Sequence, residues 1–359
     1  MKKLHVGILG ATGIVGQRFI TLLANHPWFE TVVVAASPSS AGKSYKAAVK
    51  DRWYMHISIP PKIEDLTVVA VEAGMDKIAS QVQLVFSALD LDKEKIRLIE
   101  DSYAQKGVAV VSNNSAHRWT ADVPMIMPEV NPHHVKLIDI QRKKRNYTSG
   151  FIAVKPNCSI QSYVTILTAL KKYKPLKVDI TSLQSISGAG KTFTSWPEMV
   201  DNCIPFIGGE EEKSEKEPLK IWGEIVGNKL KLAQTPKITA TCIRVPTTDG
   251  HMASVSVKFD NKPSQEQIIK TVADFNPLKQ LNLPSSPTQL ISYFQDDNRP
   301  QTKLDRDFGN GMGVTMGRLR KDSLLDWKFI ALSHNTIRGA AGGAILVAEL
   351  LYKRGYIKN

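Results

Sequence analysis

The segment that most constrains the fold is Leu4–His26, where a short apolar run meets spaced glycines and then a helical pattern. "LHVGILG" is typical of a buried parallel strand, and "GIVGQRFITLLANH" repeats apolar residues at helical spacing. Between the two, Gly10, Gly13 and Gly16 form a GxxGxxG turn. Such glycines let a pyrophosphate approach the backbone, and the following helix N-terminus favours its negative charge. The turn predicts a dinucleotide site; the alternative is a plain strand–helix turn.

The first half of the chain repeats this alternation. Further β-branched runs are Thr31–Ala36, Val82–Leu89 and Val108–Asn113, and a helical pattern after the second of these runs ends at Gly107. Strands that alternate with helices indicate a parallel, doubly wound sheet of the Rossmann type. We therefore expect a first α/β domain over residues 1–156.

The second half has a different pattern, with long strand-like runs in "LKVDITSLQSIS", "KITATCIRV" and "HMASVSVKFD". Alternation in the last run indicates one buried and one wetter face, and hence a more antiparallel sheet. We expect an α+β domain over residues 157–334. The closing pattern "TIRGAAGGAILVAELLYKRG" predicts a helix in segment 335–359 that returns to the first domain, with one packing face made by Ile337, Ala341, Ala344, Ala348 and Leu351.

The chain carries a formal net charge of +13 over 359 residues, which raises the question of a nucleic-acid partner. The only dense basic run is Gln141–Tyr147, and the other lysines are scattered without interleaved aromatics. We interpret the excess as a solvated surface that also suits anionic substrates. No apolar run is long enough to cross a membrane, and the apolar part of the N-terminus is too short for a signal peptide. A cytoplasmic protein is expected.

The end of the second predicted strand indicates which cofactor is bound. NAD enzymes commonly place a carboxylate there for the ribose hydroxyls. Here the strand ends "AASPSSAGK", which offers Ser37, Ser39, Ser40 and Lys43 but no carboxylate. Hydroxyls and a lysine suit a 2′-phosphate, so NADP(H) is favoured.

Three cysteines are present, Cys158, Cys203 and Cys242, and they form no CxxC pair. This pattern argues against a disulfide framework and a zinc site. Cys158 follows Asn157 and precedes a helical pattern that begins at Ser159, and a thiol at a helix N-terminus should have a lowered pKa. We predict a nucleophile at Cys158, the alternative being an inert buried cysteine. Cys203 and Cys242 are expected to be packing residues.

A candidate base follows in "CIRVPTTDGHMASVSV". Arg244 ends one predicted strand and His251 starts the next, so both side chains are expected at one edge. Because histidine titrates near neutral pH, His251 is expected to take the thiol proton and return it. The run Gly208–Glu217 is charged and would usually be a solvated loop, although Glu210 and Lys213 would share a face on a helical turn.

These segments together resemble one family. "GATGIVGQRF", "SPSSAGK", "SNNSAHR", "PNCS", "QSISGAG", "GGEEEK", "RVPTTDGH" and "HNTIRGAAGG" occur in the order, and over nearly the whole length, of aspartate-β-semialdehyde dehydrogenases of the archaeal and fungal branch. The resemblance implies NADPH-dependent reductive dephosphorylation of L-aspartyl-4-phosphate to L-aspartate-4-semialdehyde, in the pathway to lysine, threonine and methionine. It also implies that the second domain is catalytic and forms a homodimer or homotetramer through its sheet.

The resemblance implies roles for individual residues. Cys158 would form an acyl-thioester, His251 would act as acid and base, and Gln184 would position the substrate. The substrate would be held by Arg244 at its carboxylate, by Glu210 at its amino group, and by Arg118, Lys213 and Asn157 at its phosphate. The cofactor would contact Gly10, Thr12, Gly13, Ile14, Val15, Gly16, Ser37, Ser39, Ser40, Ser87, Ser187, Gly188 and Asn335.

The substrate's charges fit these residues independently, because a carboxylate, an ammonium and a phosphate require two cationic ends and one anionic one. Backbone N–H groups at the predicted helix N-terminus beside Cys158 are expected to stabilise the oxyanion. Three residues depart from the family pattern: His117, Ile160 and Lys191.

Two alternatives stay open. A related CoA-thioester reductase, such as malonyl-CoA reductase, would not need the amine-binding Glu210. A non-catalytic NADPH-binding sensor would need neither Cys158 nor His251.

Overall fold

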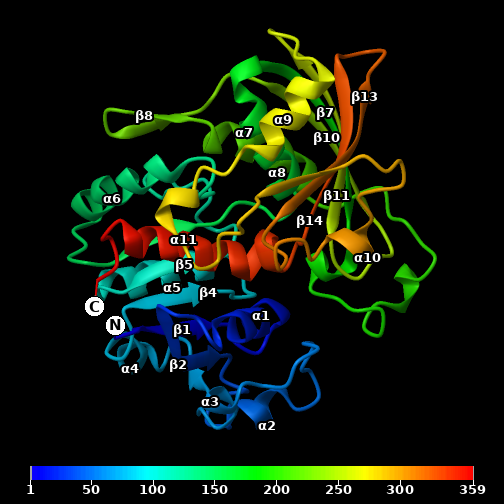
Figure 1. Ribbon diagram of the computed structural model, residues 1–359. Helices are drawn as coiled ribbons and strands as arrows, with labels where there is room; N and C mark the ends of the chain where they lie inside the picture. Colours follow the sequence, from blue (N-terminus) through cyan, green and yellow to red (C-terminus); the bar gives the residue numbers. More distant parts are fainter. Residues whose placement is uncertain (1, 359) are drawn as a thin grey trace.

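The computed structural model describes residues 2–358 as two sheets joined by helices (Figure 1). Met1 and Asn359, at the ends of the first and last predicted segments, lie outside the described residues. The predicted boundary between residues 156 and 157 falls in the turn after the last strand of the first sheet, and it stays a prediction.

The first sheet is parallel throughout and has six strands in the order β3-β2-β1-β4-β5-β6. This confirms the predicted Rossmann-type order, in which the first strand lies at the centre and the chain switches direction beside it. The strands are β1 (Leu4–Leu9), β2 (Phe29–Ala36), β3 (Val69–Ala70), β4 (Leu84–Ser87), β5 (Ala109–Ser112) and β6 (Phe151–Val154).

Helices cover both faces of this sheet because its strands are apolar on both sides. The residues Leu4, Val6 and Ile8 share a core cluster with α1 and α11, whereas Leu9 and Val85 pack with α5. The helices of this part are α1 (Ile14–Leu23), α2 (Tyr45–Val49), α3 (Pro61–Glu64), α4 (Met75–Ala79), α5 (Lys93–Gln105), η1 (Pro132–Lys136) and α6 (Leu137–Arg145).

The second sheet is mixed, with the order β10-β7-β11-β14-β13-β12. The pair β10–β7 and the pair β12–β13 are parallel, and the three inner pairs are antiparallel, so the expected α+β arrangement is confirmed. Its strands are β7 (Pro175–Gln184), β10 (Lys237–Arg244), β11 (His251–Phe259), β12 (Ile291–Phe294), β13 (Val314–Lys321) and β14 (Trp327–Ser333). A separate hairpin pairs β8 (Glu224–Val226) with β9 (Lys229–Lys231).

The alternation predicted for β11 is present, because every second residue from His251 to Phe259 is buried and those between are partly or fully exposed. The buried face packs against α7, and the same apolar cluster continues through α7 to β4 and α5 of the first sheet. The helical segments here are α7 (Gln161–Ala169), η2 (Leu170–Tyr173), η3 (Ile186–Ala189), η4 (Pro197–Met199), α8 (Glu210–Ile221), α9 (Gln265–Ala273), η5 (Lys279–Leu281) and α10 (Thr302–Asp305).

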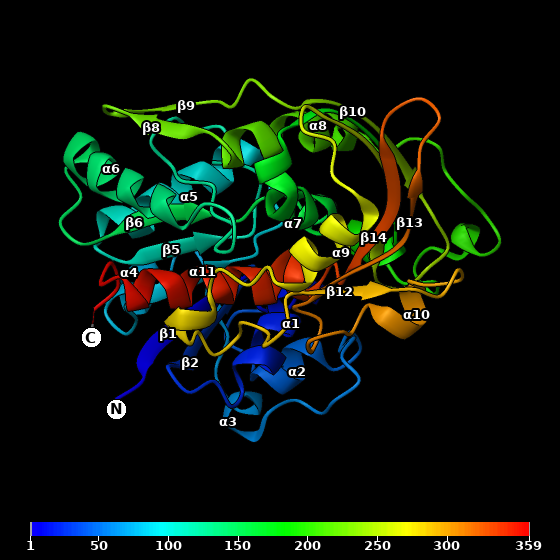
Figure 2. The same cartoon turned by 45° about the horizontal axis from the view of Figure 1, so that its top comes forward.

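The closing segment returns to the first sheet as predicted, and α11 (Gly342–Lys353) lies beside α1 in both views (Figures 1 and 2). Two details of the prediction are wrong. A wide turn, η6 (Ile337–Ala341), kinks at Ala340 before the helix begins, and Gly342–Leu351 is buried on every side rather than on one face. The turn is held by Arg338, whose guanidinium is buried and donates to Glu129 at 2.8 Å.

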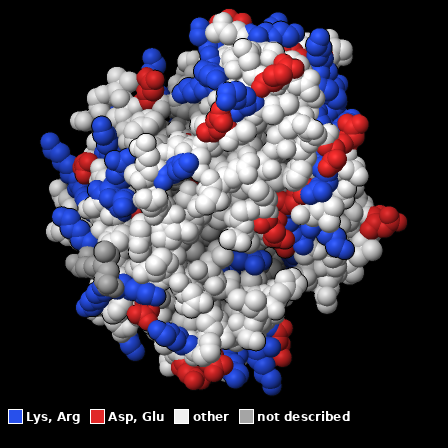
Figure 3. Space-filling view, in the orientation of Figure 1, with Lys and Arg blue, Asp and Glu red and all other residues white. Residues whose placement is uncertain are grey.

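Two arginines of the basic run Gln141–Tyr147 make hydrogen bonds and ion pairs within the protein. Arg145 lies 2.7 Å from Asp122 and 2.5 Å from Asp101, and Arg142 donates to the carbonyls of Ser149 and Gly150. Over the face drawn in Figure 3, basic side chains are interspersed with acidic ones and form no continuous patch. Within residues 2–358, no helix is long and apolar enough to cross a membrane.

Candidate active site

Cys158 and His251 meet where the two sheets join. Cys158 lies in the turn between β6 and α7, and His251 is the first residue of β11. The Cys158 Sγ lies 3.4 Å from His251 Nε2, which is within hydrogen-bonding reach for sulfur. The predicted juxtaposition of thiol and imidazole is therefore present, although the two residues are 93 positions apart in the chain.

The protonation states differ from those expected. Burial raises the pKa of Cys158, as does the Glu210 carboxylate, and the cations of Lys155, Arg118 and Arg244 offset this only in part. The expectation of a lowered thiol pKa is therefore wrong for this structure.

The expected titration of His251 near neutral pH is also wrong. Burial, with a further contribution from Arg244, lowers the pKa of His251 to about 3. The resting pair is therefore a neutral thiol beside a neutral imidazole.

The helix after Cys158 begins later than predicted. The first residue of α7 is Gln161, and Ile160 rather than Cys158 stands at its N-cap. The Ser159 N–H was expected to stabilise an oxyanion, but it donates to Asn157 Oδ1 at 2.8 Å and is not available for that role. Ile160, the residue that departs from the family pattern, is wholly buried in the core, which explains an apolar side chain there.

Gln184 and Arg244 lie side by side because they end neighbouring parallel strands in register. Arg244 donates to the Ser185 carbonyl at 2.6 Å, which fixes its guanidinium. Gln184 is buried, and its Nε2 has no hydrogen-bond partner among the described residues. A buried amide without a partner is costly, so this group suits a bound ligand's oxygen.

The charged run Gly208–Glu217 is not a solvated loop, because α8 begins at Glu210 and turns one face inward. Lys213 Nζ lies 2.7 Å from Glu210 Oε1, so the predicted shared face is confirmed. Burial alone would raise the pKa of Glu210, but Lys213 and the Asn157 amide outweigh it and the pKa is lowered. Glu210 is thus a buried carboxylate that stays ionised.

The same face of α8 supplies a partner for Arg118. Glu217 Oε1 accepts from Arg118 Nη1 at 2.9 Å, and Glu217 Oε2 accepts from the Asn157 N–H at 2.7 Å. Asn157 in turn donates its side-chain amide to Glu210 at 3.0 Å. Every polar group of the Asn157 side chain is therefore engaged within the protein, which favours a positioning role over direct phosphate binding.

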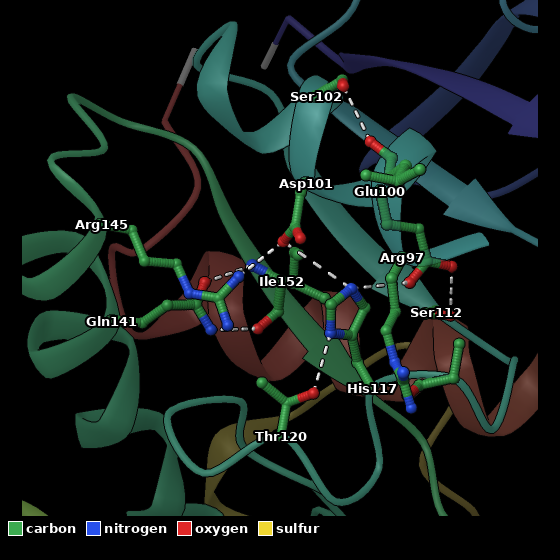
Figure 4. Close-up of polar contacts among 12 residues, drawn as sticks. Arg97, Glu100, Asp101, Ser102, Ser112, His117, Thr120, Gln141, Arg145 and Ile152 are labelled. Atoms are coloured by element: carbon green, nitrogen blue, oxygen red, sulfur yellow. Dashed lines mark hydrogen bonds and ion pairs between the residues drawn. The ribbon is translucent and has the colours of Figure 1, made fainter. Parts of the chain in front are cut away.

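The loop that carries His117 and Thr120 lies against α5, which supplies Arg97, Glu100 and Asp101 to this contact (Figure 4). Arg97 donates to the Ala116 carbonyl at 2.8 Å, and Ser112 donates to Glu100 at 2.6 Å. His117 is buried, and its Nε2 lies 3.7 Å from Asp101. His117, a departure from the family pattern, thus supports the loop from inside, whereas Lys191 is exposed.

The glycine turn has the form that the sequence predicts. Gly10 has a φ of +83°, and a Cβ there would lie 2.3 Å from the Ala88 carbonyl oxygen. A Cβ on Gly16 would lie 2.2 Å from the Gly10 oxygen, so both positions exclude a side chain. Gly13 caps α1 without a side-chain hydrogen bond, which leaves the helix N-terminus unshielded.

The serines after β2 differ in exposure. Ser37 and Ser39 are exposed and lie 2.9 Å apart through their hydroxyls, whereas Ser40 is buried and accepts from Arg52 at 3.0 Å. Arg52 was not anticipated, and its exposed guanidinium at this strand end suits a 2′-phosphate. Ser87, at the end of β4, is also buried and accepts from Asn114 at 3.0 Å.

Ser187, Gly188 and Asn335 lie together. Asn335 donates to the Ser187 hydroxyl at 2.8 Å and accepts from the Gly250 N–H at 2.8 Å. A Cβ on Gly188 would lie 2.9 Å from both Arg244 Nη1 and His251 Cε1.

The turn η6 links Cys158 to α1, the helix that follows the glycine turn. The turn η6 packs against α1, and a Cβ on Gly339 within it would lie 2.8 Å from the Cys158 Cβ.

Four residues at the site were not predicted from the sequence. Glu217 could have been found from its seven-residue spacing to Glu210 on one helix face, and Arg52 from its basic side chain near the serines. Ser185 gives no such signal, because only the fold brings it beside His251. Lys155 precedes Cys158 by three residues, but only the structure shows that its side chain is buried. Cys242 is buried as expected, but Cys203 is exposed, so the prediction that it packs is wrong.

Known proteins match the chain over nearly its whole length. Family models described as "Semialdehyde dehydrogenase, NAD binding domain" and "Semialdehyde dehydrogenase, dimerisation domain" match residues 5–138 and 167–338. The chain is 44% identical to aspartate-semialdehyde dehydrogenase of Archaeoglobus fulgidus, with 99% of this chain and 100% of that protein covered. It is 42% identical to the Schizosaccharomyces pombe enzyme, with 98% of each chain covered. The crystal structure of aspartate-semialdehyde dehydrogenase with NADP from Candida albicans superposes with a TM-score of 0.88 at 37% identity, with 99% of this chain and 100% of that chain covered.

Proposed function

The chain belongs to the aspartate-semialdehyde dehydrogenase family, and on that premise we propose that it interconverts L-aspartyl-4-phosphate and L-aspartate-4-semialdehyde with NADP(H). The observation that carries the proposal is the Cys158–His251 contact of 3.4 Å, with Arg244, Glu210 and Arg118 around it. These groups supply a nucleophile, a general acid/base and the three charges that the substrate requires. The reaction belongs to the biosynthesis of lysine, threonine and methionine.

The residues at the first sheet fit NADP(H). Gly10 and Gly16 have no room for a side chain, and the bare N-terminus of α1 suits a pyrophosphate. Thr12, Ile14 and Val15 would line this turn, and Ser37, Ser39 and Arg52 would hold the 2′-phosphate. Ser187, Gly188 and Asn335 would hold the nicotinamide. When bound, the cofactor supplies the hydride in one direction and accepts it in the other.

The substrate is gripped at three points in this proposal. Arg244 binds the carboxylate through a guanidinium that Ser185 already orients. Glu210, ionised despite burial, accepts from the ammonium group. Arg118 and Lys213 bind the phosphate, and Asn157 keeps Glu210 and Glu217 in place between them.

The chemistry passes through Cys158. Its thiolate attacks the acyl phosphate carbonyl, phosphate leaves, and a thioester remains on the sulfur. Gln184 Nε2, buried without a partner among the described residues, donates to the carbonyl oxygen as negative charge develops there. His251 takes the proton of the Cys158 thiol across the 3.4 Å contact as the sulfur attacks, and returns it when the thiol is released. In the reverse direction the same thiolate adds to the semialdehyde carbonyl, the thiohemiacetal would give up its hydride to the bound cofactor to become the thioester, and phosphate then displaces the sulfur from the acyl group.

The test measures NADPH formation from semialdehyde, phosphate and NADP, with NAD assayed alongside. Cys158→Ala is expected to abolish turnover while NADPH binding, followed by fluorescence, persists. Cys203→Ala is the matched control, because that thiol is exposed, and it should behave as the unaltered protein. Substantial turnover by Cys158→Ala would sink the assignment, and oxidation of NADPH by malonyl-CoA would favour the CoA-thioester alternative.

A dimer or tetramer formed through the second sheet, in a cytoplasmic enzyme, completes the proposal. The dimerisation-domain match over residues 167–338 supports an oligomer, and the partly exposed face of β11 offers a surface for it. Light scattering after gel filtration distinguishes the two states. A monomer at micromolar concentration would contradict this part of the proposal.

A further inference from the structure

Lys155 is a buried lysine in the turn that carries the nucleophile. It follows β6, precedes Cys158 by three residues and is only 2% exposed. Within residues 2–358 its side-chain nitrogen makes one hydrogen bond, to the Pro156 carbonyl, and forms no ion pair. An ammonium carries three N–H donors, and burying one without a countercharge is costly. The position of this lysine therefore requires an anion nearby.

The closing segment encloses both Lys155 and Cys158. A Cβ on Gly343, in α11, would lie 3.3 Å from Lys155 Cδ, and a Cβ on Gly339, in η6, would lie 2.8 Å from Cys158 Cβ. The two glycines are four residues apart, so one short stretch of chain packs against the lysine stem and against the nucleophile. Arg118 Nε also donates to the Lys155 carbonyl at 3.1 Å. The lysine is thus fixed at its backbone and along its stem, and its charge stays in the interior.

The carboxylates near Lys155 are already paired with arginines. Glu217 lies 2.9 Å from Arg118, and Glu129, which lines the same small cavity as Lys155, lies 2.8 Å from Arg338. Three cations therefore face two carboxylates, which leaves the group one negative charge short. Cys158 is the other acid that acts on Lys155, and within residues 2–358 its sulfur is bonded to no cation. A thiolate at Cys158 would balance the charges.

We propose that Lys155 is a positioning residue whose buried ammonium supplies the countercharge for the Cys158 thiolate once His251 has taken the thiol proton. The inference rests on the proposed function and adds one residue to it. Burial and Arg118 lower the pKa of Lys155 to about 7, whereas Cys158 and Glu217 act to raise it. Burial and Glu210 raise the pKa of Cys158, and Lys155 is foremost among the cations that oppose them. Each charge of the pair therefore favours the other.

The pH dependence of Cys158 alkylation by iodoacetamide tests this pairing in the full chain, with the modified residue located by mass spectrometry. The reagent is uncharged, so removal of a lysine does not change its attraction to the site. Cys203→Ala is the background, because the exposed Cys203 would react as well. Since the thiolate is the reactive form, the midpoint of the rate against pH gives the pKa of Cys158.

Lys155→Met removes the charge and keeps an unbranched stem. A neighbouring opposite charge commonly lowers the pKa of an acid by about 1 to 3, so the midpoint should rise by at least about 1 and the rate near pH 7.5 should fall at least about tenfold. The rates of the two proteins should converge as the pH rises. A misplaced thiol would instead react more slowly at every pH. An unchanged midpoint, or a loss that is equal at every pH, overturns the proposal.

The other groups that act on this pair stay unaltered in the test, so a change in the midpoint is due to Lys155. They come from the loop after β5, the segment before η1, α8, β10, β11 and η6, and they are Arg118, Glu129, Glu210, Glu217, Arg244, His251 and Arg338.

Two further variants separate the charge from other effects. Lys155→Gln keeps an N–H donor for the Pro156 carbonyl but no charge, so it should move the midpoint as Met does. A shift in Lys155→Met alone would assign the effect to the hydrogen bond and overturn the role of the charge. Lys220→Met removes another buried ammonium, which donates to the carbonyls of Arg118, Thr120 and Val123, and it should leave the midpoint in place.

An equal shift in Lys220→Met would show that any buried cation of this region has the effect, and would overturn the specific role of Lys155. NADPH binding, followed by fluorescence, confirms that each variant is folded. Alkylation does not depend on turnover, so failure of this inference and failure of the proposed function are distinguishable.

Discussion

Gly188→Ala tests whether the site depends on close packing around His251 and Arg244. The added methyl carbon would lie 2.9 Å from Arg244 Nη1, 2.9 Å from His251 Cε1 and 3.0 Å from His251 Nε2. Ordinary contacts are about 3.5–4.0 Å, so one or both side chains must move by roughly 0.5–1 Å. Neither moves freely, because Arg244 is bonded to the Ser185 carbonyl at 2.6 Å and His251 to the Ser185 N–H at 3.1 Å.

A displacement of about 1 Å in a catalytic group can cost roughly 10²-fold in rate. We therefore expect kcat of Gly188→Ala to fall about 100-fold, which corresponds to about 2.7 kcal/mol in the activation barrier. The melting temperature should stay close to that of the unaltered protein, because Gly188 does not have a positive φ and Ala fits its backbone.

The assay is phosphate-dependent NADPH formation, with kcat and the KM of each substrate measured separately. Gly208→Ala is the matched control, because that glycine is exposed and its added methyl would meet nothing within 4 Å. A kcat within about threefold of the unaltered enzyme, or a loss confined to the KM for NADP, would refute the reasoning, since the clash is with His251 and Arg244.

Three further measurements concern buried charges. Glu217→Gln leaves Arg118 buried without its carboxylate, so urea unfolding should show a loss of about 3 kcal/mol; a loss below about 1 kcal/mol would contradict the pairing. Burial raises the pKa of Glu100, so ionising this carboxyl destabilises the folded protein increasingly as the pH rises above its pKa in the unfolded chain. Relative to the unaltered protein, Glu100→Gln should therefore be more favourable to stability at pH 8 than at pH 4. An equal change in the free energy of unfolding at the two pH values would contradict this. Burial lowers the pKa of His134 to about 4, against about 6.5 in the unfolded chain, so the neutral ring favours the folded state above about pH 6.5. About 3 kcal/mol of the free energy of unfolding is therefore lost between pH 7 and pH 4. His134→Gln should make the free energy of unfolding fall less steeply over this range, and an unchanged slope would contradict the assignment.

The architecture and the pairing of chemical groups were predictable from local patterns. The GxxGxxG turn, the alternating runs and the positions of Cys158, Arg244 and His251 at element ends each rest on short stretches of chain. The parallel register that places Gln184 opposite Arg244 follows from two strands ending at the same edge. Such features can be predicted because they depend on backbone geometry and on the periodic burial of side chains.

The protonation states were not predictable in the same way. The sequence places Cys158 near a helix start, but it does not show how deeply the thiol is buried or that Glu210 lies beside it. Likewise, Arg244 and His251 were expected at one edge, but the burial that chiefly lowers the pKa of His251 is visible only in the tertiary structure. The charged run after Gly208 was misjudged because its acidic residues find cationic and amide partners from other segments.

The apolar cluster that runs from β4 through α7 to β11 has a consequence for how the molecule comes apart. The two halves share one apolar core, so no solvated boundary separates them. The C-terminal helix α11 also packs over the N-terminal strands of the first sheet. Loss of either half exposes the inner side of the other, so the two should unfold together at a single denaturant concentration. A hinge between these two halves is correspondingly disfavoured.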